Sequence, residues 1–180
     1  MTVDDESILD AWRGTREHRD DIWEALVEPV VGAADPGLDA LRRLRAELGG
    51  SMAALEQALA APISGRHSAW AERVDVALGE LSADLDEHVA VTEGSDGLHD
   101  AVLATTPRLS NSVRRLVSEH TVIRGLIGDL LTRVKPPVAA GEVDTIRELG
   151  TALLAGLGRH REHGADLIHQ AYQIDLGGET

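Results

Sequence analysis

The chain contains no cysteine and no phenylalanine among its 180 residues. It therefore offers no disulfide, no thiolate metal ligand and no cysteine nucleophile. Aromatic residues amount to only 2% (Trp12, Trp23, Trp70 and Tyr172), whereas Ala, Leu, Glu and Arg are abundant. Strands usually draw on aromatic and β-branched side chains, and the residues abundant here are strong helix formers. The composition therefore predicts an all-α protein.

Further absences bear on partners and location. The net charge of −14 repels phosphate backbones and anionic lipid, so we expect neither nucleic acid nor a membrane surface as a partner. The N-terminal segment 1–6 contains three acidic residues and lacks the apolar segment of a signal peptide. No apolar run is long enough to span a bilayer. We therefore expect a cytoplasmic protein. The motifs of serine hydrolases, P-loops and dinucleotide-binding sites are missing, so no motif predicts an enzyme.

Proline and glycine divide the sequence into helical segments. After an N-terminal helix over about 4–31, we expect helices over about 38–60, from the Ser64-Gly65 turn to about Thr92, over 98–104, 108–134 and 143–172. Residues 36–180 would form an up-down four-helix bundle. Residues 1–35 would form a helical extension packed on it.

Apolar residues recur at intervals of three and four in these helices, as in the seam of a left-handed bundle. In three of the seams, one position is a histidine instead: His88, His120 and His160. The predicted seams are Leu38, Leu41, Leu48, Met52, Leu55 and Leu59; Trp70, Val74, Leu78, Leu81, Leu85, His88 and Thr92; Leu109, Val113, Leu116, His120, Ile123, Ile127, Leu130 and Val134; and Ile146, Leu149, Leu153, Leu157, His160, Gly164, Leu167 and Ala171.

Three histidines on three seams point to a metal site. A single core histidine is usually a hydrogen-bonded structural residue, because an unsatisfied buried polar group is destabilising. Side chains from facing helices converge on metals in bundle cores, and neutral imidazole is a ligand for iron and zinc. We therefore predict that His88, His120 and His160 bind a metal ion, with Glu93 as a fourth ligand.

These residues also resemble the hemerythrin-like (HHE cation-binding) domain family. Glu119-His120-Thr121-Val122-Ile123 is similar to the third-helix motif of that family. Leu85-Asp86-Glu87-His88 and Leu157-Gly158-Arg159-His160 are similar to the beginnings of the second- and fourth-helix motifs. The resemblance covers about residues 38–173 and implies a four-helix bundle with a metal centre in its core.

The chain departs from the family pattern at the carboxylates. The resemblance implies a bridging carboxylate four residues after the second- and fourth-helix histidines, but Thr92 and Gly164 stand there. Leu48 or Gly49 stands about where the first family histidine would be. Because a family di-iron centre uses five histidines and two carboxylates, the resemblance implies a mononuclear or altered iron or zinc site.

Other interpretations remain open at this point. The chain could be a metal-free bundle with a structural or interaction role that has lost the di-iron site. It could also be an enzyme of oxygen or peroxide chemistry, although no residue specifies a substrate, or it could self-associate as a homo-oligomer. The other histidines are interpreted as surface, loop or solvated helix-flank residues; they are His18, His67, His99, His163 and His169.

Overall fold

A computed structural model describes residues 36–63, 67–139 and 141–172. The chain divides into two compact units, Met1–Asp39 and Ala40–Thr180, and the description below concerns the second. Every regular element in the described residues is a helix, which confirms the predicted all-α class. The elements are α2 (Pro36–Ala60), α3 (His67–Glu93), α4 (Leu98–Thr105), the 3-10 helix η1 (Pro107–Leu109), α5 (Ser110–Arg133) and α6 (Glu142–Tyr172). The predicted helix over 4–31, with Trp12, His18 and Trp23, lies outside the described residues.

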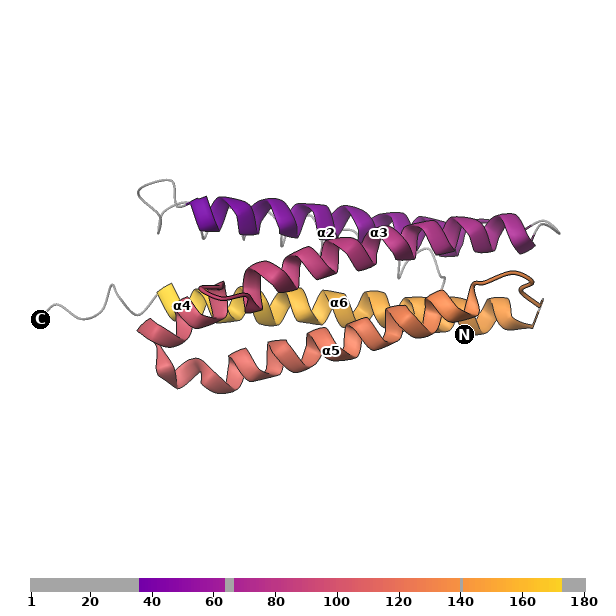
Figure 1. The fold of residues 1–180 in the computed structure, drawn as a ribbon. Coiled ribbons are helices and arrows are strands. Elements are labelled where there is room, and N and C mark those ends of the chain that lie inside the picture. The colour runs from indigo at the N-terminus through magenta and orange to yellow at the C-terminus, as the bar shows by residue number, and fades with distance from the viewer. Residues whose placement is uncertain (1–35, 64–66, 140, 173–180) are drawn as a thin grey trace, which may run out of the picture. The chain divides into compact units, whose positions relative to one another are not determined.

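The long helices α2, α3, α5 and α6 have roughly parallel axes, and the short α4 lies at one end of α3 (Figure 1). Helix α5 packs against both α6 and α3, and α4 packs against α3 and α6. Within the described residues, no helix combines the length and the apolarity that crossing a membrane requires.

The predicted seams form the core. Every seam residue predicted in α3 is buried, as is every one predicted from Leu109 to Val134. In α6, Leu149, Gly164 and Ala171 are half-buried and the rest of the seam is buried. In α2 the described seam side chains, Leu48, Met52, Leu55 and Leu59, are buried too. The period of three and four residues was thus sufficient to assign the inward face of each long helix.

Two apolar clusters make up this core. The larger one joins residues of α2, α3, α5 and α6, and the smaller one joins Val102, Leu109, Val113, Leu116 and Leu167 at the α4 end. His120 follows Leu116 of the smaller cluster and precedes Ile123 of the larger one. The histidine on α5 therefore lies where one apolar cluster gives way to the other.

The end of α2 is held against α6 by one arginine. The Arg147 guanidinium donates from Nε to the Leu59 carbonyl oxygen (3.0 Å) and from Nη2 to the Ala61 carbonyl oxygen (3.1 Å). These carbonyls belong to the last turn of α2 and the residue after it, where the helix offers no N–H partner. The same guanidinium lies 5.6 Å from the ring centre of the fully buried Trp70. One side chain thus caps α2 and covers the core tryptophan.

Helices α2 and α6 come close together at Gly150. A Cβ placed on Gly150 would lie 2.5 Å and 2.9 Å from the two methyl carbons of Leu59, which is itself buried. Gly79 on α3 is also within a helix, but a Cβ there would meet nothing within 4 Å. The two glycines therefore provide a matched test of this contact.

Replacing Gly150 by alanine should destabilise the protein by about 1–3 kcal/mol, because Leu59 must leave its place in a packed core. Gly79→Ala should instead stabilise it by about 0.5–1 kcal/mol, because alanine loses less backbone entropy in a helix. Urea unfolding followed by circular dichroism gives both free energies of unfolding. Equal effects of the two substitutions would contradict the close contact between α2 and α6.

Candidate metal centre

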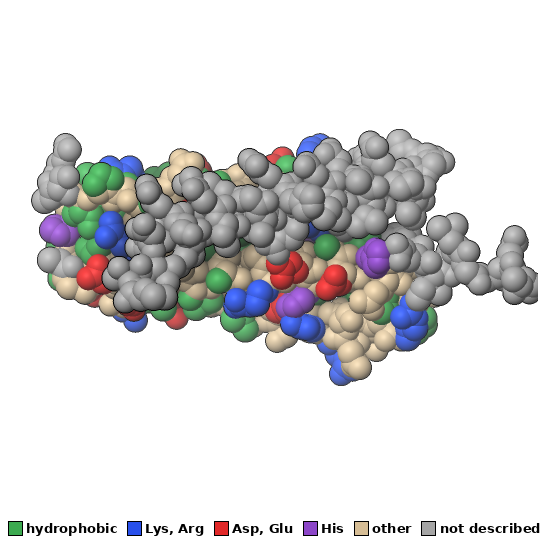
Figure 2. All heavy atoms as spheres, turned by 180° about the vertical axis from the view of Figure 1, so that it is seen from behind, with side chains coloured by type: hydrophobic (Ala, Val, Ile, Leu, Met, Phe, Trp, Pro, Cys, Tyr) green, Lys and Arg blue, Asp and Glu red, His purple; other side chains and the backbone are tan. Residues whose placement is uncertain are grey.

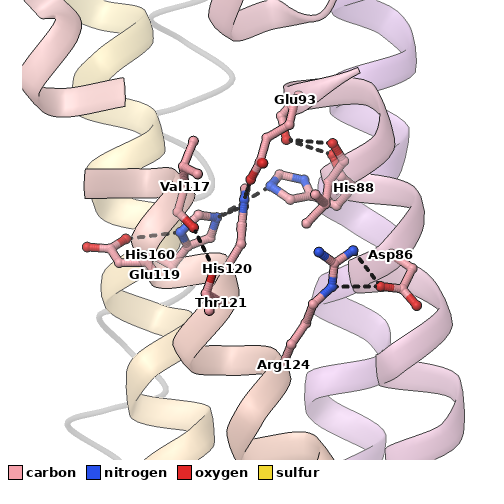
Figure 3. A network of polar contacts seen from close by, with 11 residues as sticks. Asp86, His88, Glu93, Val117, Glu119, His120, Thr121, Arg124 and His160 are labelled. Carbon is pink, nitrogen blue, oxygen red and sulfur yellow. Dashed lines mark hydrogen bonds and ion pairs between the residues drawn. The ribbon is translucent and has the colours of Figure 1, made fainter. Parts of the chain in front are cut away.

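Three histidine rings from three helices meet in the core. His88 comes from α3, His120 from α5 and His160 from α6, and all three are buried. The Nε2 atom of His160 lies 3.0 Å from Nε2 of His120 and 3.4 Å from Nε2 of His88. Each ring offers one nitrogen such that the three nitrogens all lie within 4.8 Å of one another. Figure 3 shows the rings pointing toward a common centre.

The ring planes are set at steep angles to one another. The His88 ring is almost perpendicular to the rings of His120 (81°) and His160 (88°), with ring centres 5.3 and 5.5 Å away. The rings of His120 and His160 are 4.4 Å apart and tilted by 58°. The three rings therefore approach edge to edge through their nitrogens instead of stacking face to face.

Two carboxylates hold the outer nitrogens of two of these rings. Glu93, the last residue of α3, contacts Nδ1 of His120 through Oε1. Glu119, the residue before His120 on α5, lies with Oε2 3.0 Å from Nδ1 of His160. An ionised carboxylate only accepts hydrogen bonds, so Nδ1 carries the proton in both histidines. In a neutral imidazole, Nε2 then presents a lone pair.

The inner nitrogens of His120 and His160 cannot both present lone pairs to each other without a proton or another positive charge between them. Two lone pairs facing each other across the 3.0 Å between His120 and His160 repel, unless a positive charge lies between them. A single shared proton would satisfy this one contact. A metal ion at the centre would accept the lone pairs of all three rings at once, in the manner of carboxylate–histidine–metal arrangements.

Burial keeps His88 and His160 neutral. Removal from water, together with the neighbouring His160 and His120, lowers the pKa of His88 to about 3. Desolvation also lowers the pKa of His160 to about 4, against the opposing effect of Glu119. Neutral imidazole is the form that binds a metal. The environment thus favours the protonation state that a metal site requires.

Glu119 belongs to a wider polar network. Its Oε1 accepts from Nδ1 of His163 (2.7 Å) and from Nε of Arg115 (3.1 Å), and Nη2 of Arg115 lies 2.6 Å from Nε2 of His163. Desolvation raises the pKa of the Glu119 carboxyl group, but hydrogen bonds to His160, His163 and Arg115 outweigh this effect and the pKa is lowered. The carboxylate is therefore fixed on both sides, one oxygen toward the His160 ring and the other toward the surface.

The structure brings together the three histidines predicted from the sequence. Glu93 lies at the outer edge of His120, away from the inner Nε2 atoms, and 28% of its side chain is exposed. Thr92 and Gly164, which stand at the carboxylate positions of the resembled family, both line the cavity beside the rings. The Thr92 hydroxyl donates to the carbonyl oxygen of His88 (2.9 Å). Glu119 was not predicted to be part of the site, although it directly precedes His120 in the sequence.

His99 was misinterpreted. The sequence suggested a surface or loop residue, but His99 is in the first turn of α4 with 6% of its area exposed. Its ring is nearly parallel to that of His120 (15°) with centres 6.3 Å apart. The prediction failed because α4 has only 8 residues, too few for periodicity to assign a buried face. His163 was predicted to lie on a solvated helix flank, but its side chain is only 22% exposed and is bound to Glu119.

The rings of His88, His99, His120 and His160 share a cavity of about 40 Å³. The cavity is also lined by Arg45 and Leu48 of α2, Leu98 of α4 and Arg161 of α6. A cavity of this size exceeds the minimum of about 10–15 Å³ needed for one water molecule. An ion with an accompanying water would therefore fit.

Comparisons with known proteins give no relative. No family model, no curated protein and no solved structure matches the chain.

The lowered pKa values predict how stability depends on pH in the presence of a chelator. Below pH 6.5 the unfolded chain binds protons at His88 and His160 that the folded chain does not bind until about pH 3 and 4. The free energy of unfolding should therefore keep its full value above pH 6.5. It should decrease as the pH falls toward 4, by about 1.4 kcal/mol per pH unit for each histidine.

Urea unfolding in chelator at several pH values tests this expectation. The double variant His88→Gln/His160→Gln serves as the control and should show a clearly flatter dependence. If the parent and the double variant lose stability equally over this pH range, the two histidines are not held neutral in the folded state.

Proposed function

We propose that the chain is a hemerythrin-like, up-down helical bundle that binds a single metal ion, iron or zinc, through His88, His120 and His160. The observation that carries the proposal is the meeting of their inner nitrogens with separations of 3.0 and 3.4 Å. Tetrahedral ligands at about 2.0–2.1 Å from zinc are roughly 3.3–3.4 Å apart. The spacing of the rings thus supports a common ion as their partner.

The two glutamates are proposed as outer partners of the metal ligands. Each accepts from the Nδ1 atom of a ring whose Nε2 atom faces the centre. Such partners fix the tautomer and the orientation of a histidine ligand and raise its basicity. This assigns Glu93 a supporting role beside His120, in place of the direct ligation expected from the sequence. We propose a cytoplasmic binding protein, with no nucleic acid or membrane as a partner.

The absence of family-type carboxylates supports a mononuclear site over a dinuclear one. Thr92 and Gly164 line the cavity where bridging oxygens would be needed, and neither supplies a carboxylate. The same observation supports a second candidate, a metal-free bundle with a structural or interaction role. In that case a proton shared between His120 and His160 would satisfy the facing lone pairs.

Metal analysis separates these two functions. Protein purified without a histidine tag should contain close to one equivalent of iron or zinc, and His120→Ala should lose it. His169→Ala, an exposed position on the same helix as His160, is the control and should keep it. Chelation should lower the melting temperature of the parent but not of His120→Ala, because a ligand of the folded state stabilises it. A parent without metal, whose melting temperature zinc and iron leave unchanged, would favour the metal-free bundle.

Neutralising the carboxylate beside His160 tests the proposed outer partners. Glu119→Gln should weaken zinc binding about 10- to 100-fold, as is usual when an outer partner is lost. Asp129→Asn, an exposed acidic position on the same helix, is the matched control and should bind zinc as the parent does. Competition with a chromophoric chelator measures the dissociation constants. Equal affinities of the Glu119 and Asp129 variants would exclude Glu119 from the site.

A further inference from the structure

His99 is a fourth buried histidine, in addition to the three proposed ligands. Its Nδ1 atom is inaccessible to solvent and has no hydrogen-bond partner in the described part of the chain. Burying a polar nitrogen without a partner is destabilising. Desolvation, followed by the nearby His120, lowers the pKa of His99, so the ring is neutral and retains a lone pair. A neutral, buried imidazole whose Nδ1 atom has no partner can accept a further ligand there.

The position of His99 is set by the connection from α3 to α4. A Cβ on Gly97 would lie 2.7 Å from the Gly94 carbonyl oxygen and 2.8 Å from that of Thr92, so only glycine fits this turn. Asp96 has a positive φ of 61° in the same turn. The chain therefore reverses tightly after Glu93, and the first turn of α4 is placed against the end of α3. His99 is on that first turn and lines the same cavity as the other three rings.

The spacing of the rings brings His99 close to ligand distance. Two imidazoles bound tetrahedrally to one zinc ion have ring centres roughly 5.3 Å apart, given about 2.0–2.1 Å from nitrogen to metal. The His88 ring already meets this value with His120 (5.3 Å) and His160 (5.5 Å). The centre of His99 is 6.3 Å from that of His120, and its ring is stacked nearly parallel to that ring (15°), outside the group of three whose nitrogens lie within 4.8 Å of one another. To bind the same ion, the His99 ring must therefore shift toward the centre and turn a nitrogen to it.

We propose that His99 is the fourth protein ligand of the metal, so that the site binds a zinc-like divalent cation through four imidazoles. This inference rests on the proposed metal-binding function. Helix α4 contributes the imidazole, whereas α2 presents Leu48 and the cationic Arg45 to this cavity and no metal-ligating side chain. Four nitrogen ligands close a tetrahedral zinc site, and closed sites of this kind are structural, whereas three protein ligands leave a position open for water or substrate.

The test uses the full chain and zinc ion as the probe. His99→Leu removes the unpartnered buried Nδ1 atom and leaves an apolar side chain of similar size, so the metal-free protein should melt at the same temperature as the parent or higher. Its zinc affinity should fall by more than the 10- to 100-fold expected for the loss of an outer partner. His169→Leu, on an exposed position of α6, is the control and should retain the parent affinity.

A second measurement reports the ligand set directly. With Co²⁺ in place of zinc, the visible spectrum of the parent should be that of a closed four-coordinate site. The spectrum of His99→Leu should change, because a water molecule replaces the missing imidazole. A parent that binds zinc, with a His99→Leu variant of equal affinity and identical Co²⁺ spectrum, would overturn the role of His99 alone. A parent that binds neither ion would overturn the metal site altogether, and this role with it.

Discussion

The whole site depends on one constraint: the nitrogens of a buried imidazole need partners. Each ring has two nitrogens, and a buried nitrogen without a partner is destabilising. Glu93 and Glu119 satisfy the outer nitrogens of His120 and His160, and in doing so they direct the lone pairs inward. Nδ1 of His88 and Nδ1 of His99 have no partner in the described residues. Two of the three rings are therefore fixed by carboxylates at their outer nitrogens, while the inner nitrogens of all three contact only one another.

The long helices and their buried faces could be predicted because each is long enough for several repeats of its apolar pattern. Leucine and valine at every third or fourth position assigned the inward face of α5, and His120 occupied one position of that series. The convergence of three histidines followed once three seams faced the same core. Their height along the bundle could only be estimated from the distance to the helix ends.

The parts that could not be predicted depend on side-chain reach and on short elements. Glu93 ends α3 and bends toward His120, a contact across 27 positions that helical periodicity does not describe. Glu119 is next to the seam in sequence, yet its partner His160 is 41 residues away on another helix. The burial of His99 depends on the turn at Gly97, whose geometry brings α4 against α3. Each of these contacts is fixed by three-dimensional packing after the helices have formed.

The surface gives little indication of a partner of opposite charge. The net charge is −14, yet on the face seen in Figure 2 acidic and basic side chains lie close to one another. The exposed pairs that link helices follow the same mixture, as between Arg124 and Asp86 (2.7 Å) and between Lys135 and Asp75 (2.9 Å). Exposed pairs of this kind contribute little to stability, at most about 1 kcal/mol each. Cohesion between the helices therefore comes mainly from the apolar seams.

The spacing of the histidines along the chain has a kinetic consequence. His120 and His160 are 40 residues apart, and His88 and His160 are 72 residues apart. No single helix and no pair of consecutive helices contains all three rings, so the centre is assembled only when α3, α5 and α6 pack together. An ion bound as proposed would join three helices that are distant in the sequence, so its dissociation rate would report on motions of all three and not of one loop.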